Sequence, residues 1–272
     1  MLSRGGAKQD LDDEDRCHID EASRVQWQRK KSNAHQEDPC HPGCRRGAAL
    51  GGAGLAAATS TTGATSAANA AYNCSAAPYP EIDLAGCGLK NHNLVGAHLA
   101  TADLANADLQ GADLQQAHLT GANLTGMAMA DSNLKDADLT DSTLDNATLN
   151  GTNLDDAYLN NADLNNADLT GADLYGAHLA GADLTGANLY DANLTGATLN
   201  DATLYGATLT GADLTGADLT GANLYDANLT DANLTGANLT GANLTGVTWS
   251  STTCPDGTNS NNDSGTCSGH LG

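Results

Sequence analysis

The amino-acid sequence predicts an all-β solenoid, a fold in which one short unit repeats along an axis. Every fifth residue from Leu84 to Leu244 is Leu, with Met129 as the one exception. Two places before these central positions, from Ala97 to Ala242, the residue is Ala in 26 of 30 cases. The chain has no Phe, and aromatic residues make up 3% of its 272 residues, so Leu and Ala must supply the core.

The period of five determines how the chain must run. It fits neither the helical period of about 3.6 residues nor the two-residue alternation of a flat strand. A chain that turns a corner every five residues does fit, with Leu and the preceding small residue inside and the other three positions outside. One buried Leu contributes about 1.5–3 kcal/mol, whereas ordering five backbone residues costs about 5–10 kcal/mol. Single units therefore cannot fold alone, and stability must come from stacking.

The repeat resembles the pentapeptide-repeat family, whose pattern is A(D/N)LXX, from Ile82 to about Ser251. The resemblance implies a right-handed quadrilateral β-helix with four pentapeptides in each coil. The 34 pentapeptides centred on Leu84 to Trp249 would then form about eight coils, and residues 20 apart would stack. Representative leucines of the expected core ladder are Leu104, Leu124, Leu169, Leu189, Leu209 and Leu229.

The segments before the repeats differ from them in composition. Residues 1–46 are polar with mixed charges, which predicts a disordered leader. Residues 45–70 hold an arginine pair, an Ala/Gly/Leu run and a small-residue end, the layout of a secretory signal of the twin-arginine type. This segment lies far from Met1, so either the true start lies downstream or the run is an Ala/Gly linker.

We expect the repeats, residues 84–249, to be closed by an N-terminal cap, 71–83, and a C-terminal cap or tail, 250–272. Both caps contain Pro and Cys, which suits segments that block open strand edges. The C-terminal segment also resembles the tails that follow such repeats in secreted bacterial relatives.

Four of the seven cysteines follow the signal-like segment and form two pairs with 13-residue spacing. The pairs are Cys74 with Cys87 and Cys254 with Cys267, one at each end of the repeats. Two short-range disulfides would indicate an oxidising compartment. The alternative is buried free thiols, and Cys87 falls on an inward-facing position that would suit one.

The charge of the chain restricts its partners. Residues 1–46 hold nine basic and nine acidic residues, so the net charge of −22 belongs to residues 47–272. Such an acidic surface would repel nucleic acid and anionic membranes. The sequence contains no apolar run of the length that spans a membrane.

One surface column offers candidate metal ligands. If residues 20 apart stack, His98, His118 and Asp138 are neighbours at about 4.8 Å spacing and could share a metal ion. The alternative is that they are solvated side chains on a tolerant surface. Columns of Thr or Tyr, such as Tyr205 and Tyr225, could likewise bind a polymer, or they could simply keep the surface soluble. We find no nucleophile beside a base and no phosphate-binding loop, so we predict no catalytic residues and no cofactor.

Two functions remain open. The first is a non-enzymatic, secreted or periplasmic rod that presents a regular acidic surface to a protein or polymer partner. The second is a cytoplasmic DNA mimic, because the resembled family includes gyrase-protecting proteins whose acidic β-helix imitates duplex DNA. Those relatives carry Phe at many central positions and a C-terminal dimerising helix, whereas this chain has no Phe and ends in a Cys-bounded polar loop. The sequence predicts neither the partner nor the oligomeric state.

Overall fold

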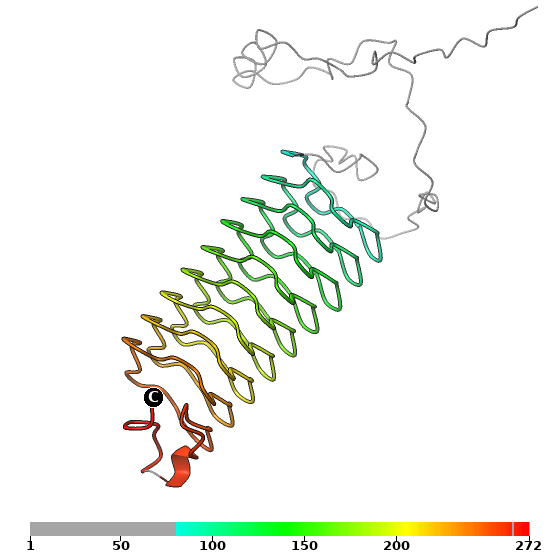
Figure 1. The fold of residues 1–272 in the computed structure, drawn as a ribbon. Coiled ribbons are helices and arrows are strands. Elements are labelled where there is room, and N and C mark those ends of the chain that lie inside the picture. The colour runs from blue at the N-terminus through cyan, green and yellow to red at the C-terminus, as the bar shows by residue number, and fades with distance from the viewer. Residues whose placement is uncertain (1–79, 263, 272) are drawn as a thin grey trace, which may run out of the picture. The chain divides into compact units, whose positions relative to one another are not determined.

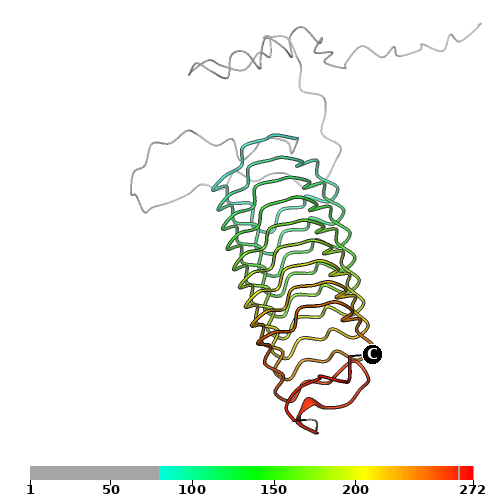
Figure 2. The ribbon, with the colours of Figure 1, turned by 90° about the vertical axis from the view of Figure 1, so that its left-hand side faces the viewer.

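The computed structural model describes residues 80–262 and 264–271. The predicted leader, the signal-like segment and residues 71–79 of the predicted N-terminal cap lie outside the described residues. The described chain winds in stacked coils whose axis runs from the cyan end to the red end of the ribbon (Figures 1 and 2). No helix in this described part is long and apolar enough to cross a membrane.

Parallel β-bridges set the register of the coils. Each bridge in the stack joins residues 20 apart, from Asp83 with Asp103 to Asn233 with Thr253. Four pentapeptides therefore complete one coil, as the resemblance implied. The handedness and the number of coils stay predictions.

The strand content is lower than the term all-β suggests. Within the described residues no strand is longer than a single bridge residue, and the regular element is the short 3-10 helix η1, Ser260–Asn262. The reason is the length of each side: corners occupy both ends of a five-residue unit, so one residue is left in ladder register.

Left-handed backbone conformations make the corners. Every fifth residue from Gly86 to Gly246 has a positive φ, between 53° and 75°. These positions hold Gly, Asn or Asp, with Thr101 and Gln116 as exceptions. Gly adopts this conformation without penalty, and Asn and Asp adopt it more readily than other residues with a side chain. The sequence therefore carries the corner signal as Gly, Asn or Asp at nearly every fifth position.

A single pentapeptide, 187–191, shows why the bridge position prefers Asp or Asn. The N–H groups of Asn188, Leu189 and Asp191 donate to backbone oxygens of neighbouring coils at 2.7–3.0 Å. The Ala187 N–H donates to the Leu184 carbonyl across the preceding corner (3.0 Å). The remaining donor, the N–H of Tyr190, reaches the side-chain Oδ1 of Asn188 (3.3 Å). An Asx side chain thus supplies the acceptor that the backbone lacks at the corner.

The core is a stack of leucine layers separated by alanines. The structure places six leucines of the predicted ladder at 0% exposure: Leu104, Leu124, Leu169, Leu189, Leu209 and Leu229. Alanines fill most of the small positions and are equally buried. Since the Leu side chain points to the axis on every side, each coil buries its apolar atoms against the coils above and below.

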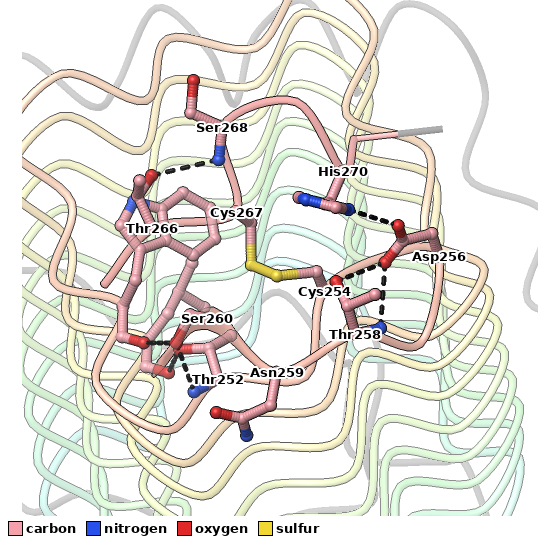
Figure 3. The surroundings of a disulfide bond; sticks show 12 residues. Thr252, Cys254, Asp256, Thr258, Asn259, Ser260, Thr266, Cys267, Ser268 and His270 are labelled. Carbon is pink, nitrogen blue, oxygen red and sulfur yellow. Dashed lines mark hydrogen bonds and ion pairs between the residues drawn. A yellow bond between two sulfur atoms is a disulfide. The ribbon is translucent and has the colours of Figure 1, made fainter. Parts of the chain in front are cut away.

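The C-terminal end folds back over the last coil. The five-residue pattern continues past the predicted boundary at 249, because Thr253 still bridges Asn233 and Cys254 is buried in the next central position. The chain then reverses, and Asn259 pairs antiparallel with Thr253. Figure 3 shows this cap around the Cys254–Cys267 disulfide, whose Cα atoms are 5.4 Å apart.

Polar side chains hold the cap in place. The buried Ser260 hydroxyl donates to the carbonyl of Trp249 and accepts the Thr252 N–H (3.1 Å). The side chain of Asp256 contacts His270 Nδ1 at 2.5 Å (Figure 3). Hydrogen bonds from Thr258 and the His270 contact lower the pKa of Asp256 to about 2. The last backbone edge is therefore covered on this side by its own tail rather than left open.

Candidate functional site

Aromatic rings gather in one bridge column, which we call the His98 column. Its members are consecutive in the bridge ladder: His98, His118, Asp138, Tyr158, His178, Thr198, Asp218 and Asn238. The rings of His98 and His118 stack with centroids 4.9 Å apart and planes 3° apart. The rings of Tyr158 and His178 stack at 4.8 Å and 15°. Two ring pairs therefore lie along one side of the coils, separated by the coil of Asp138.

The ring geometry does not suit the metal site considered from the sequence. Imidazole nitrogens bind metals in the plane of the ring, so the parallel, stacked rings of His98 and His118 aim their lone pairs in separate layers. Among the described residues no group of three or more His, Cys, Asp or Glu side chains could hold a metal ion. The structure thus brings His98, His118 and Asp138 together as a stack and not as a chelating cluster.

Asp138 is held as a carboxylate. Its Oδ2 accepts the Thr120 hydroxyl (2.9 Å) and its Oδ1 accepts the N–H of Thr140 (3.1 Å). Partial burial acts to raise the pKa of Asp138, but the hydrogen bonds from Thr140 and Thr120, with the nearby His118, together lower it below the ordinary value. The side chain therefore keeps its negative charge.

A shallow depression opens beside this carboxylate. It has a volume of about 480 Å³ and is lined by Gly96, Gln116, His118, Asp136, Asp138, Thr140 and Tyr158. The lining combines two carboxylates, an amide, a hydroxyl and two rings. Such a surface can bind a cationic or hydrogen-bonding group and stack a planar one. The sequence pointed to this column through its histidines but not to the depression, which requires Gln116 and Asp136 from the adjoining corner.

Elsewhere along the same column the polar groups are engaged with one another. The hydroxyl of Thr220 donates to Asp218 Oδ1 (2.5 Å), and the amide of Asn238 donates to the same oxygen (3.2 Å). That amide also donates to the Thr220 hydroxyl (2.8 Å). These bonds engage Oδ1 of Asp218, and its neighbours in the column, Thr198 and Asn238, carry no ring.

One carboxylate is perturbed in the opposite direction. Burial raises the pKa of Asp163, and the neighbouring carboxylates Asp145 and Asp183 raise it further, against a hydrogen bond from the N–H of Asn165. Asp145 also has a buried Oδ1 without a hydrogen-bond partner. These three carboxylates are crowded like charges, and the depression does not include them.

The cysteines predicted to form disulfides include three described residues, Cys87 near the start of the repeats and Cys254 and Cys267 in the C-terminal cap. Cys254 and Cys267 are bonded to each other and both are 0% exposed. Cys87 is a buried disulfide cysteine, and its predicted partner Cys74 lies outside the described residues.

Comparison with known proteins supports the resemblance seen in the repeat. A family profile described as pentapeptide repeats matches eight copies within residues 82–246. No curated protein matches the chain.

Solved structures of three proteins are similar to the chain. HetL, a pentapeptide repeat protein involved in heterocyst differentiation regulation from the cyanobacterium Nostoc sp. strain PCC 7120, is 33% identical over 69% of this chain and 95% of HetL, with a TM-score of 0.37. Rfr23, a pentapeptide repeat protein from the cyanobacterium Cyanothece 51142, is 46% identical over 31% of this chain and 58% of Rfr23, with a TM-score of 0.31. QnrB1, a plasmid-mediated fluoroquinolone resistance protein, is 19% identical over 63% of this chain and 90% of QnrB1, with a TM-score of 0.35.

Proposed function

Because the chain belongs to the pentapeptide-repeat family, as its repeat pattern predicted, we propose that it acts as a non-enzymatic interaction rod in an oxidising compartment outside the cytoplasm. Two features support the non-enzymatic part. The coils supply a regular scaffold, and the column that carries the depression has carboxylates and rings without a nucleophile paired to a base.

The disulfide chemistry supports the compartment. The Cys254–Cys267 bond closes the C-terminal cap, and its sulfurs are buried where reductants have little access. Disulfides of this structural kind persist in secreted and periplasmic proteins and are rare in the cytosol. Cys87, at the opposite end of the repeats, is a disulfide cysteine as well.

The mass of the mature protein tests this proposal. We expect the protein isolated from its native host to begin near Ala71, with a mass lower by four hydrogens than that of the reduced chain. A protein that begins at Met1 and carries reduced thiols would contradict export. The matched variants Cys254→Ser and Cys267→Ser should each lower the unfolding free energy by about 3 kcal/mol, the value for a loop of this length.

A DNA mimic is the second candidate, because acidic side chains occur on all four bridge columns. The examples Asp183, Asp168, Asp173 and Asp218 each lie in a different one. A supercoiling assay with DNA gyrase tests this idea directly. Inhibition by purified rod at micromolar concentration would support it, and an unchanged supercoiling rate would remove it.

A further inference from the structure

We propose that the coil of Asp138 is a guanidinium-binding site, through which the rod docks an exposed arginine side chain of a partner protein. The proposal rests on the proposed role as an interaction rod, to which it adds the place of contact and the chemistry of the partner. It does not depend on export.

The spacing of the ring column carries the argument. His118 and Tyr158 belong to the coils before and after Asp138, so their rings are separated by two coil spacings, about 9.6 Å. A planar group in the layer of Asp138 would lie about 4.8 Å from each ring. The observed ring pairs stack at this spacing, 4.9 and 4.8 Å. The layer of Asp138 therefore has room for one planar group between the rings of His118 and Tyr158.

The depression shows that this place is open. Its lining includes His118, Asp138 and Tyr158, and the aspartate side chain is shorter than the rings beside it. A group that enters the depression would meet the carboxylate at its inner end and a ring on either side. Tyr158 is 45% exposed; one face of its ring stacks on His178 in the following coil, which leaves the opposite face toward the coil of Asp138.

The charges around the depression favour a cation. Asp136 and Asp138 both line it. Lys135, which precedes Asp136 in the chain, contacts Asp155 in the next coil, and this contact, with the charges of Asp136 and Asp156, raises the pKa of Lys135. The Lys135 charge therefore offsets part of the Asp136 charge, but it is not among the groups that shift the pKa of Asp138. The lowered pKa of Asp138 keeps that group ionised.

The carboxylate retains capacity for a ligand. Asp138 accepts hydrogen bonds from the Thr120 hydroxyl and from the backbone and side chain of Thr140, and the two oxygens of a carboxylate can together accept about four. A guanidinium that lies in the carboxylate plane would donate at the remaining position, with the charge-assisted hydrogen bond that arginine forms with carboxylates. Its flat faces would then meet the rings above and below.

These features distinguish arginine from other groups. Lysine presents a compact ammonium that cannot stack on two rings, and a neutral planar group lacks the charge. The same column contains a natural control in Asp218, whose neighbours are Thr198 and Asn238 and whose Oδ1 already accepts two side-chain donors. Asp218 has the charge without the rings or the opening.

A titration of the purified chain with capped amino acids tests the site. The probe is N-acetyl-arginine methylamide, and the matched probes are the same derivatives of citrulline, a neutral isostere, and of lysine. Ring signals of His118 and Tyr158 are followed by NMR at a constant pH near 8. We expect saturable shifts with the arginine derivative and at least about tenfold weaker binding of the other two.

Variants locate the site. Asp138→Asn should weaken arginine binding at least about tenfold, and Tyr158→Thr about three- to fivefold. Asn and Thr both occur in this column, so neither change should disturb the fold, which circular dichroism checks. The control Asp218→Asn should leave the affinity unchanged within about twofold.

Three results would overturn the proposal. These are equal binding of the arginine and citrulline derivatives, an effect of Asp218→Asn as large as that of Asp138→Asn, and binding of free arginine without binding of the capped derivative. The last result would mean a small-molecule site and not a docking site. Each leaves the mass measurement untouched, so this proposal and the proposed export fail separately.

Discussion

Residues 127–156 and residues 186–246 follow the same backbone path, but they differ in the side chains that fill the core and in the hydrogen bonds that these side chains form. In the first region, which we call the irregular segment, larger or polar residues replace alanine in the core. They are Met127, Ser132, Ser142 and Thr152. The same region contains all the buried side-chain oxygens that lack a partner among the described residues: Ser132 Oγ, Asp145 Oδ1, Asn150 Oδ1 and Asp155 Oδ1.

In the second region, the regular segment, every small core position is alanine and every central position is leucine. Its outer surface carries ladders of Asx and Thr side chains, beside the exposed rings of Tyr190, Tyr205 and Tyr225. For example, Thr215 donates to Asp213 (2.5 Å), and Asn233 donates to Thr215 (2.9 Å). An Asn that follows an Asp in the next coil replaces a like-charge contact by a hydrogen bond.

The backbone path therefore does not depend on perfect repeats. In both regions the backbone hydrogen bonds have closely similar lengths. Leu144 and Leu189 donate to the next coil at 2.6 and 2.7 Å, and Ser142 and Ala192 both donate across a corner at 3.1 Å. The path is set by corners and backbone bonds, and the side chains then determine how much stability and binding capacity each coil has. The depression beside Asp138 lies in and next to the irregular segment.

The largest effect should follow a charge in the regular core. Leu189→Asp places an unpaired carboxylate at a position of 0% exposure, which costs several kcal/mol and should unfold the neighbouring coils. Thermal melting by circular dichroism measures this. The surface control Thr235→Asp should change the unfolding free energy by less than about 0.5 kcal/mol. A melting temperature of Leu189→Asp within about one degree of wild type would contradict the stacked core.

A repair of the irregular segment should stabilise the chain. Ser132→Ala removes a buried hydroxyl that has no partner and restores the alanine of the repeat, so we expect a gain of about 1–3 kcal/mol in urea unfolding. The matched change Ser142→Ala removes a hydroxyl that donates to the Leu139 carbonyl (2.7 Å) and should give no such gain. Equal effects of the two substitutions would show that partnering of the hydroxyl is not the cause.

Substitution of a glycine at a corner should reduce the stability by a smaller amount. Gly216 has a φ of 66°, and an added Cβ would meet no atom within 4 Å. Gly216→Ala should therefore lose about 1–2 kcal/mol through conformation alone. Gly216→Asn should lose clearly less, because asparagine occupies this conformation at other corners, such as Asn166. If alanine and asparagine were equally tolerated in thermal melts, the corner conformation would not explain the residue choice.

A charge added to a column of Asx side chains should lower the unfolding free energy by about 1 kcal/mol or less. Asn233→Asp puts a carboxylate one coil from Asp213, at about 4.8 Å, and repulsion at this distance is about 0.9 kcal/mol in water. The repulsive part of the loss should disappear in about 1 M salt, because the charges are near the surface. The part that comes from the lost amide hydrogen bonds to Asp213 and Thr215 should remain. Urea unfolding at low and high salt separates the two, and a loss that does not change with salt would show that charge repulsion does not contribute.

The smallest effect concerns the crowded carboxylates beside the irregular segment. Because the pKa of Asp163 is raised, the folded chain binds its proton more tightly than the unfolded chain does. Stability associated with this group is therefore present below the ordinary carboxyl pKa and is lost as pH rises through the folded pKa. Asp163→Asn should raise the melting temperature at about pH 7 but not at about pH 3. An equal change at both pH values would exclude this titration.

Much of the fold could be predicted from the sequence because the repeat is local. A five-residue period, with Leu at one position and Ala at another, leaves one path that buries both, and the resemblance added the 20-residue coil. The role of Asn188 could not be predicted, because nothing in the pattern shows that its side chain accepts the Tyr190 N–H. The same holds for the positive φ at Gly216, which follows from the geometry of the corner.

The candidate site was predicted in part. The column of His98, His118 and Asp138 was identified from 20-residue spacing, and the structure brings these residues together in one column, with the two His rings stacked. Counting in fives shows which side chains face the axis, whereas the columns also required the 20-residue coil that the resemblance implied. The folded structure adds that the histidine rings lie parallel, that Gln116 and Asp136 join the column from a neighbouring corner, and that Asp138 but not Asp218 lines the depression. The physical reason is that side-chain direction and hydrogen-bond partners depend on contacts between coils, which no single pentapeptide contains.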